Sequence, residues 1–346
     1  MRSWPHFIEQ DAARVKARPT VDFQSARSQR CAPSKMEPTK IMKRFYAPQT
    51  RTQEHQIVID APSEFVWTAL TEAQELPRWL VDREAWVEPR VGGKIWRSWG
   101  GGSHEEGRID VWEPRHRLGL RLEAFTSCGH RYKIRSGITE EFQLVKHGAQ
   151  TELYLVHAGV PVDSEWDHYY STTNRAWMMY LRTLRHYLEY HRGKPRRLTK
   201  LLARLPGALE EAWLNLAGTC GLSRRLQGEN QFTVRTLGTT FSGNVSFVEA
   251  PIVFDLIIRE LDNALFSGRM GYSGPHGYAL TALSVYGETT DRLAALEKRW
   301  HEYVSTALPI YGETTDRLAA LEKRWTRLVA DVLDFRGGVG IANTGF

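Results

Sequence analysis

The stretch SEWDHYYSTTNRAWMMYLRTLRHYLEYHR, residues 164–192, predicts one long amphipathic helix around which the first half of the chain folds. Its apolar and aromatic side chains recur at steps of three and four, the period of a helix with one buried face: Trp166, Tyr170, Thr173, Trp177, Tyr180, Leu181, Leu184 and Leu188. The charged side chains between them are predicted to face water: Arg175, Arg182, Arg185, Glu189 and Arg192. Ser164 suits the start of a helix, and Gly193 followed by Pro195 suits its end.

The residues before this helix predict an antiparallel sheet. Gln56–Asp60 has the pattern of a first strand, and a helix that starts at Ser63 and a short helical piece at 76–80 follow it. About six further strands fit between residues 87 and 157, and in 118–123 every second residue is leucine, the alternation of a half-buried strand. Only the long helix is large enough to cover the apolar face of such a sheet, so the predicted class is α+β.

An ordered series of short motifs accompanies this pattern. It comprises Ala61-Pro62, Val66-Trp67, Ala69-Leu70-Thr71, Leu76-x-x-Trp79, Gly92-Gly93, Gly107-x-Ile109, Glu113-Pro114, Phe142-x-Leu144, Thr151-x-Leu153-x-Leu155-x-His157, and Trp177 with Leu181 and Leu184. Over residues 55–192 the series resembles the Hsp90-ATPase-activator-homologue branch of the SRPBCC (START-like) superfamily. The resemblance implies a helix-grip fold, in which a curved antiparallel sheet wraps a long C-terminal helix and leaves an apolar cavity between them.

A fainter copy of the same pattern is predicted at 206–330. Trp213-Leu-Asn-Leu216 is similar to Trp67-Thr-Ala-Leu70, and the run from Gly243 to Pro251 is similar to that from Gly107 to Pro114. This second copy is predicted to be shortened and to lack an equivalent of the first strand. The basic segment 193–205 is interpreted as a linker, in which leucines at 198, 201, 202 and 205 would also suit a short amphipathic helix.

A sharper repeat lies at the C-terminal end of the second copy. Residues 281–305 and 306–330 are near-identical, and the run Tyr286–Trp300 recurs unchanged as Tyr311–Trp325. Two such similar units indicate a tandem duplication rather than a solenoid, which needs at least three repeats. We expect a strand over 279–286, followed by a helix over 291–305 that is capped by Thr290. This helix of the first unit is expected to fill the single helix position of the second domain. The second unit would then extend the first or dock on another subunit, so self-association through 306–330 is expected.

The ends and the composition set further limits. Residues 1–50 are interpreted as a disordered basic leader and 331–346 as a flexible tail, with Met1, Met36 or Met42 as the true start. The net charge of +6 is modest, and no nucleic-acid-binding motif accompanies it. No apolar run is long enough for a membrane span. The N-terminal stretch is charged and lacks an apolar h-region, so no secretory signal is expected. Three widely spaced cysteines favour a reduced, cytoplasmic compartment.

Known catalytic and metal-binding motifs are missing from the sequence. The twelve histidines are scattered without HExxH or paired cysteine spacing, so no metal and no cofactor are predicted. His186 and His191 are five residues apart, a spacing that places them on different faces of a helix. Gly100-Gly101-Gly102 lacks the lysine of a phosphate-binding loop and is interpreted as a hairpin loop.

Polar side chains on the inner face of the sheet are the candidates for chemistry. Glu140 shares a strand face with Phe142 and Leu144, so we expect it to point inward with a raised pKa. His157 shares a face with Leu153 and Leu155, and a structural hydrogen bond is its more ordinary role. Glu140 and His157 are the candidate catalytic residues. The predicted ligand-binding residues are Trp79, Trp96, Trp112, Glu140, Phe142, Leu155, His157, Trp177, Tyr180, Leu181 and Leu184.

Three functions fit these observations. The first is a non-catalytic module that holds a small apolar or amphipathic molecule between sheet and helix. The second is an enzyme of the polyketide-cyclase kind that uses Glu140 or His157 as acid or base. The third, suggested by the family resemblance, is an association with a chaperone or another protein.

Overall fold

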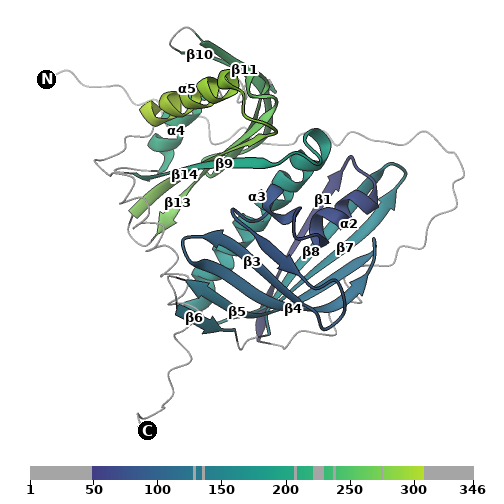
Figure 1. The fold of residues 1–346 in the computed structure, drawn as a ribbon. Coiled ribbons are helices and arrows are strands. Elements are labelled where there is room, and N and C mark those ends of the chain that lie inside the picture. The colour runs from purple at the N-terminus through teal and green to yellow at the C-terminus, as the bar shows by residue number, and fades with distance from the viewer. Residues whose placement is uncertain are drawn as a thin grey trace, which may run out of the picture. The chain divides into compact units, whose positions relative to one another are not determined.

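The computed structural model describes residues 49–127, 130–134, 137–205, 209–220, 230–236, 239–273 and 276–307 (Figure 1). The described residues all belong to one compact unit, residues 46–346. The predicted leader up to Pro48, almost all of the second repeat unit and the predicted tail therefore lie outside the described residues.

The first domain is built on an antiparallel sheet whose strands follow the order β1-β8-β7-β5-β4-β3-β2, with β6 paired to β5 (Figure 1). These strands are β1 Thr50–Ile59, β2 Ala85–Val87, β3 Lys94–Gly100, β4 Ser103–Glu113, β5 Arg117–Ser127, β6 His130–Lys133, β7 Thr139–His147 and β8 Gln150–Pro161. The helices are α2 Ser63–Thr71, the short η1 Leu76–Arg78 and the long α3 Asp167–Tyr190. A sheet with one long helix against it is the predicted helix-grip, α+β architecture.

The long helix starts three residues later than predicted. Ser164–Trp166 forms a single 3-10 turn, η2, and no side chain caps the N-terminus of α3. The predicted end is close to the observed one, because the helix stops at Tyr190 and Gly193 adopts a φ of +82°. A positive φ costs glycine little, since glycine has no Cβ.

The core of the first domain lies between α3, α2 and the sheet. Trp177, Leu181, Leu184 and Leu188 are buried along one side of α3, as the helical spacing predicts. They belong to one cluster of buried side chains with Phe142 and other inward-facing residues of the strands. Three other members of the predicted stripe, Tyr170, Thr173 and Tyr180, are only partly buried, while Trp166 at its start is buried.

The second domain is a six-stranded antiparallel sheet with the order β10-β11-β12-β13-β14-β9. Its elements are β9 Arg196–Leu205, α4 Leu209–Thr219, β10 Gln231–Thr236, β11 Thr239–Glu249, β12 Val253–Ile258, the short η4 Arg259–Leu261, β13 Ala264–Ser273, β14 His276–Tyr286 and α5 Asp291–Ala307. The first strand β9 pairs with the last strand β14, as β1 pairs with β8 in the first domain. A short helix follows the first strand and a longer helix follows the last strand in both domains.

The segment predicted as a linker is therefore a strand, and the first strand thought to be missing is present. The basic residues of β9 form ion pairs with residues outside their own sheet, which the local sequence pattern does not show. Lys200 forms an ion pair with Asp82, and Arg197 lies 3.3 Å from the Glu297 carboxylate. Leu201 is buried in the core of the second domain, which an amphipathic strand explains as well as a helix does.

Helix α5, from the first of the two repeat units, fills the position expected for it. Trp300 is fully buried, and its ring meets the rings of Phe241 and Phe266 edge-on at centroid distances of 5.1 Å. The Thr290 hydroxyl accepts a hydrogen bond from the Leu293 amide at 3.2 Å, the predicted helix cap. The second unit remains a prediction, because almost all of it lies outside the described residues.

Helix α3 also contacts the second domain, which corrects the prediction that Arg182 faces water. The Arg182 side chain is only 9% exposed, forms an ion pair with Asp255 of β12 and lies over the ring of Phe247 at 4.1 Å. All six residues of β12 are buried. Phe254, Leu256 and Ile258 point into the second core, while Asp255 points toward α3. The charge of Arg182 thus marks a contact between domains that local periodicity cannot reveal.

Two histidines lie together at the same junction, contrary to the prediction from their spacing. The helix ends at Tyr190, so the backbone of His191 is no longer helical and its ring comes within 5.1 Å of the His186 ring. His191 stacks on Tyr286 of β14 at a centroid distance of 4.4 Å, and its Nε2 lies 3.1 Å from the Asn263 carbonyl oxygen. Both histidines are buried, at 4% and 2% exposure.

We expect acid to weaken this junction. Burial, with the neighbouring His191, lowers the pKa of His186 to about 3. Because the folded pKa lies below the unfolded value of about 6.5, stability should fall as the pH drops through 6.5 and below. One such histidine contributes a loss of about 1 kcal/mol between pH 6.5 and 5.5. Chemical denaturation of His186→Phe should show a pH dependence that is shallower by this amount. The exposed His116→Gln should keep the wild-type slope, and an unchanged slope in His186→Phe would contradict the assignment.

Candidate functional site

A network of charged side chains is buried in the first domain, centred on Arg97 of β3. The Arg97 side chain is 2% exposed, and its Nη2 lies 2.8 Å from Oε2 of Glu140. The same nitrogen forms an ion pair with Glu105 of β4. Strand alternation explains the position of Arg97, because Ile95 on the same face of β3 belongs to the apolar core. One buried cation therefore holds two carboxylates.

Glu140 points inward from β7, on the face it shares with Phe142 and Leu144. The prediction that the pKa of Glu140 is raised, however, is wrong. Burial acts to raise the pKa of Glu140, but the guanidinium of Arg97 and the neighbouring His157 outweigh burial, so that its pKa is lowered. Glu140 is therefore a buried carboxylate that stays ionised, not a cavity acid.

Glu105 is the carboxyl group with the raised pKa. Its side chain is 16% exposed. Burial raises the pKa of Glu105 to about 7, with the charge of Glu140 adding to the rise and the charge of Arg97 opposing it. Two carboxyl groups on one guanidinium thus have pKa values pushed in opposite directions, a pattern found where one group must hold a proton and the other must not.

His157 of β8 connects this network to helix α3. It is the strand partner of Glu140 and is 1% exposed. The Trp177 indole donates a hydrogen bond from Nε1 to Nδ1 of His157 at 3.2 Å. Nδ1 of His157 also lies 3.7 Å from Oε1 of Glu140. Nε2 lies 3.4 Å from the hydroxyl of Tyr169, whose pKa burial raises well above its ordinary value.

An aromatic and aliphatic wall adjoins the network. Trp177 meets the rings of Phe142 and Tyr180 edge-on, at 5.7 Å and 5.8 Å between centroids. Leu155, Leu181 and Leu184 are buried in the same cluster. Six of the predicted ligand-binding residues thus form one apolar surface, and Glu140 with His157 forms its polar end.

Of the three remaining predicted tryptophans, Trp79 and Trp112 belong to or pack against the same core cluster, whereas Trp96 does not. Trp79 is 1% exposed and packed into the core, with its indole donating to the Ala69 carbonyl oxygen at 2.8 Å. Trp96 alternates with Arg97, pairs across strands with the exposed Trp86, and lies 5.2 Å from the ring of His104. Trp112 packs edge-on against Trp67 of α2 at 5.0 Å. The hydrophobic pattern predicted that these tryptophans line the ligand site, but a local pattern does not show how far each one lies from the Arg97 network.

The network residues missing from the sequence prediction are Arg97, Glu105 and Tyr169. Arg97 lies between two tryptophans, Trp96 and Trp99, whose spacing of three does not show which strand face is buried. Glu105 lies in the polar run His104-Glu105-Glu106, which is typical of an exposed strand. A helical projection that included Tyr169 with Trp166 and Trp177 could have found the tyrosine, because it lies on their face of α3.

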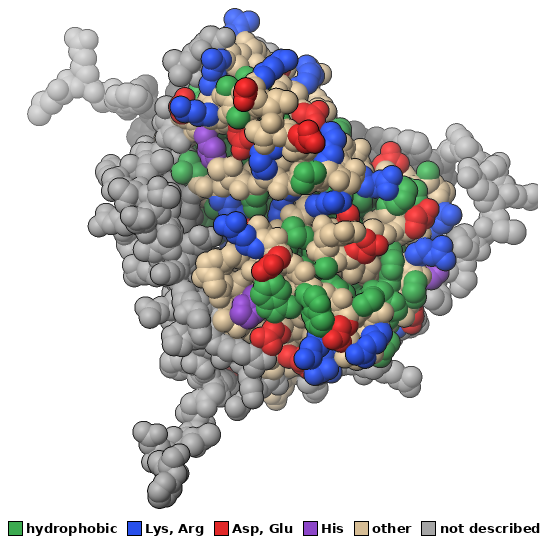
Figure 2. Space-filling model, in the orientation of Figure 1, with side chains coloured by type: hydrophobic (Ala, Val, Ile, Leu, Met, Phe, Trp, Pro, Cys, Tyr) green, Lys and Arg blue, Asp and Glu red, His purple; other side chains and the backbone are tan. Residues whose placement is uncertain are grey.

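Among the residues that the structure describes, no group of three or more His, Cys, Asp or Glu side chains is arranged to hold a metal ion. None of the described helices is both long and apolar enough to cross a membrane. Cys220 is buried and free, and burial raises the pKa of its thiol, which disfavours the reactive thiolate. On the face shown in Figure 2, basic and acidic side chains are interspersed.

We expect Glu105 to titrate near neutral pH. Infrared or NMR titration of the full chain should assign a carboxyl pKa of about 7 to Glu105, because burial outweighs its contact with Arg97. The signal should disappear in Glu105→Gln and persist in Glu123→Gln, whose side chain is a third exposed. A carboxyl titration below the ordinary range of about 4.3 would show that Arg97 dominates at Glu105 instead.

The comparisons with known proteins concern the first domain and the fold. Residues 60–189 match the family model described as Activator of Hsp90 ATPase homolog 1-like protein. None of the curated proteins matches the chain. The family match covers only the first domain, so the second copy of the fold remains a prediction from sequence similarity and topology.

Three solved structures are similar to the chain. DynU16, from the dynemicin biosynthetic locus, is 15% identical, with 82% of this chain and 96% of DynU16 covered and a TM-score of 0.39. The Aha1 dimer from Colwellia psychrerythraea is 22% identical, with 41% and 99% covered and a TM-score of 0.34. CalU16 from Micromonospora echinospora is 24% identical, with 39% and 74% covered and a TM-score of 0.30.

The family match lies on the elements that carry the buried network: it begins one residue after β1 and stops one residue before the end of α3. Residues 60–189 of this chain therefore form a domain that matches the Activator of Hsp90 ATPase homolog 1-like family model.

Proposed function

We propose that the first domain binds a small amphipathic molecule, with its polar end at the Arg97 network and its apolar body against the wall of Phe142, Trp177 and Tyr180. The observation that carries this proposal is the burial of a guanidinium and two carboxylates between sheet and helix. Replacing such an ionic group by apolar side chains is often neutral or stabilising, so stability alone does not explain it. Buried groups with shifted pKa values concentrate at functional sites.

Polar atoms without a partner support the same proposal. Arg97 Nε, Gln53 Oε1 and Thr126 Oγ1 are buried and form no hydrogen bond with the described residues. Gln53 is the strand partner of His157, and Thr126 is the strand partner of His104, next to Glu105. An unsatisfied buried polar atom costs about 1–3 kcal/mol, and a bound ligand or water would recover it. Arg97 Nε can donate a hydrogen bond, Gln53 Oε1 can accept one, and Thr126 Oγ1 can do either. This set suits a ligand with a hydroxyl or carbonyl end.

Native mass spectrometry of the purified full chain tests this function. We expect a co-purified small molecule in the wild type, and a lower bound fraction in Glu140→Gln. Glu141→Gln is the matched control, because the neighbouring side chain points to the other face of β7 and pairs with Arg117. Circular dichroism on both variants separates loss of binding from loss of the fold. No bound molecule in the wild type, or equal occupancy in both variants, would argue against the proposal.

The second candidate is a proton-transfer enzyme of the polyketide-cyclase kind. The observation that favours it is the pair of carboxyl groups on Arg97, with Glu105 titrating at about 7 and Glu140 ionised. A group whose pKa lies near the working pH is an effective acid or base. In that case Glu105→Gln should abolish turnover of a polyketone substrate while leaving its binding intact. If Glu105→Gln lost both substrate binding and turnover, the result would favour the binding module over the enzyme.

The third hypothesis is a chaperone or other protein partner, and it rests on the description of the family. No feature of the described residues adds to it. Co-precipitation of the full chain with Hsp90 would test it directly, and capture that survives Glu140→Gln would separate it from ligand binding.

A further inference from the structure

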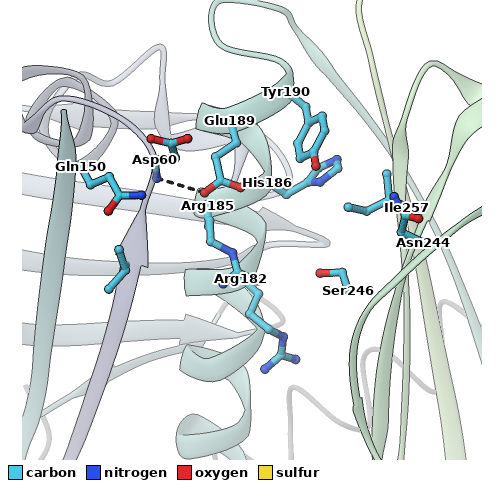
Figure 3. Close-up of a pocket in the computed structure, with 11 residues that line it drawn as sticks. Asp60, Gln150, Arg182, Arg185, His186, Glu189, Tyr190, Asn244, Ser246 and Ile257 are labelled. Atoms are coloured by element: carbon cyan, nitrogen blue, oxygen red, sulfur yellow. Dashed lines mark hydrogen bonds between the residues drawn. The ribbon is translucent and has the colours of Figure 1, made fainter. Parts of the chain in front are cut away.

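A pocket of about 290 Å³ is lined by α3 and by residues of both sheets (Figure 3). Five residues of α3 line it at helical spacing: Arg182, Arg185, His186, Glu189 and Tyr190. Val58 and Asp60 at the end of β1 and Gln150 of β8 form one wall, while Asn244, Ser246 and Ile257 of the second sheet form the other. The residues of the Arg97 network are not among those that line this pocket.

The two arginines of the pocket differ in what they bind. Arg182 is already neutralised by Asp255 and lies over Phe247, so it fixes the distance between α3 and the second sheet. Arg185 is half-buried and forms no ion pair or hydrogen bond with a described residue. Its guanidinium therefore remains available for an anion.

The wall beside Arg185 supplies further uncharged hydrogen-bonding groups. Asn244 and Ser246 are two residues apart on β11 and face the helix (Figure 3). His186 is 4% exposed, lines the pocket, and its Nε2 has no partner among the described residues. A cation with neighbouring amide, hydroxyl and imidazole groups is the usual environment of a bound carboxylate or phosphate.

Two carboxylates lie at the end of the pocket beside the first sheet. Asp60 follows β1, and Glu189 lies on α3 one turn after Arg185; Oε1 of Glu189 accepts a hydrogen bond from the Asp60 amide at 3.0 Å (Figure 3). The side-chain carboxylate of Asp60 forms no ion pair with a described residue. A molecule that spans the pocket would meet a cation at one end and carboxylates at the other.

We propose that this pocket binds a small molecule with a carboxylate or phosphate at one end and an amine at the other. Arg185, Asn244 and Ser246 hold the acidic group, and Asp60 and Glu189 receive the amine. The site needs both domains, because its two walls come from different sheets. It is independent of the function proposed for the Arg97 network.

Isothermal titration of the full chain tests the assignment with four probes: phosphoethanolamine, 4-aminobutyrate, inorganic phosphate and ethanolamine. We expect one of the two bifunctional probes to bind, and the choice between them identifies the acidic group as phosphate or carboxylate. Arg185→Gln should weaken that binding by about tenfold or more, the usual effect of losing one charged hydrogen bond. Asp60→Asn should weaken the bifunctional probe but leave inorganic phosphate unchanged.

Two controls separate this site from others. Arg175→Gln removes an exposed arginine of the same helix and should bind as the wild type does. Glu105→Gln alters the buried network and should also leave binding at this pocket unchanged. The proposal is overturned if neither bifunctional probe binds, if ethanolamine alone binds as tightly, or if Arg185→Gln retains wild-type affinity. Thermal melts of each variant confirm that the comparison is made on folded protein.

Discussion

Replacing Arg97 by methionine should destabilise the first domain by about 3–5 kcal/mol at pH 8. The side chain is 2% exposed and is the cation that neutralises Glu105 and Glu140. Methionine keeps much of the volume, so the loss comes from charge and not from a cavity. Two buried carboxylates would remain with no cation beside them, which is the costly way to break a buried ion pair.

The same variant should recover part of its stability as the pH falls. Without Arg97, burial raises the pKa of both carboxyl groups above their unfolded values. A carboxyl group with a raised folded pKa binds its proton more tightly in the folded state, so its penalty shrinks as the pH falls through that pKa. Urea denaturation at pH 8 and pH 5 should therefore give a smaller difference between variant and wild type at pH 5.

A matched surface variant provides the control for Arg97. Arg121 forms a two-bond ion pair with Asp110, but both side chains are more than 40% exposed. Arg121→Met should cost less than about 1 kcal/mol, because solvent screens an exposed pair. Adding Glu105→Gln and Glu140→Gln to Arg97→Met should restore stability. Equal losses in the two arginine variants would mean that the Arg97 network is not electrostatically buried.

The sequence carried the information for the first domain because its signals are local. The spacing of Trp177, Leu181 and Leu184 defines a helical face, and the alternation around Glu140 defines a strand face. Both features follow from backbone geometry within a few residues. These signals were enough to predict the helix-grip architecture and to place Glu140 inside it.

The rest depended on contacts between distant residues. Arg97 and Glu140 are 43 residues apart, and Arg182 and Asp255 are 73 apart. In a local pattern a charged residue is predicted to face water, and its distant partner is what avoids the cost of an unpaired buried charge. Strand β9 was predicted as a linker for the same reason. Its basic residues pair with Asp82 and Glu297, which are about 100 residues or more away in the sequence. The pKa of Glu140 was predicted in the wrong direction because Arg97, which lowers it, is distant in the sequence.

Trp177→Ala should cost the first domain about 3–5 kcal/mol, the usual range for a buried tryptophan replaced by alanine. Trp177 is 5% exposed, meets Phe142 and Tyr180 edge-on, and donates a hydrogen bond to His157. Its loss removes apolar contacts and also leaves Nδ1 of a buried histidine without a donor. Chemical denaturation followed by the fluorescence of the remaining tryptophans and by circular dichroism measures the change.

Trp177→Phe separates the two contributions. Phenylalanine keeps most of the apolar contact but cannot donate to His157, so this variant should lose about 1–3 kcal/mol, the cost of one unsatisfied buried acceptor with a small loss of volume. Chemical denaturation of Trp177→Phe and Trp177→Ala under the same conditions measures the two contributions separately. A loss below about 1 kcal/mol in Trp177→Ala would place the indole outside the core, and wild-type stability in Trp177→Phe would show that the hydrogen bond to His157 contributes nothing.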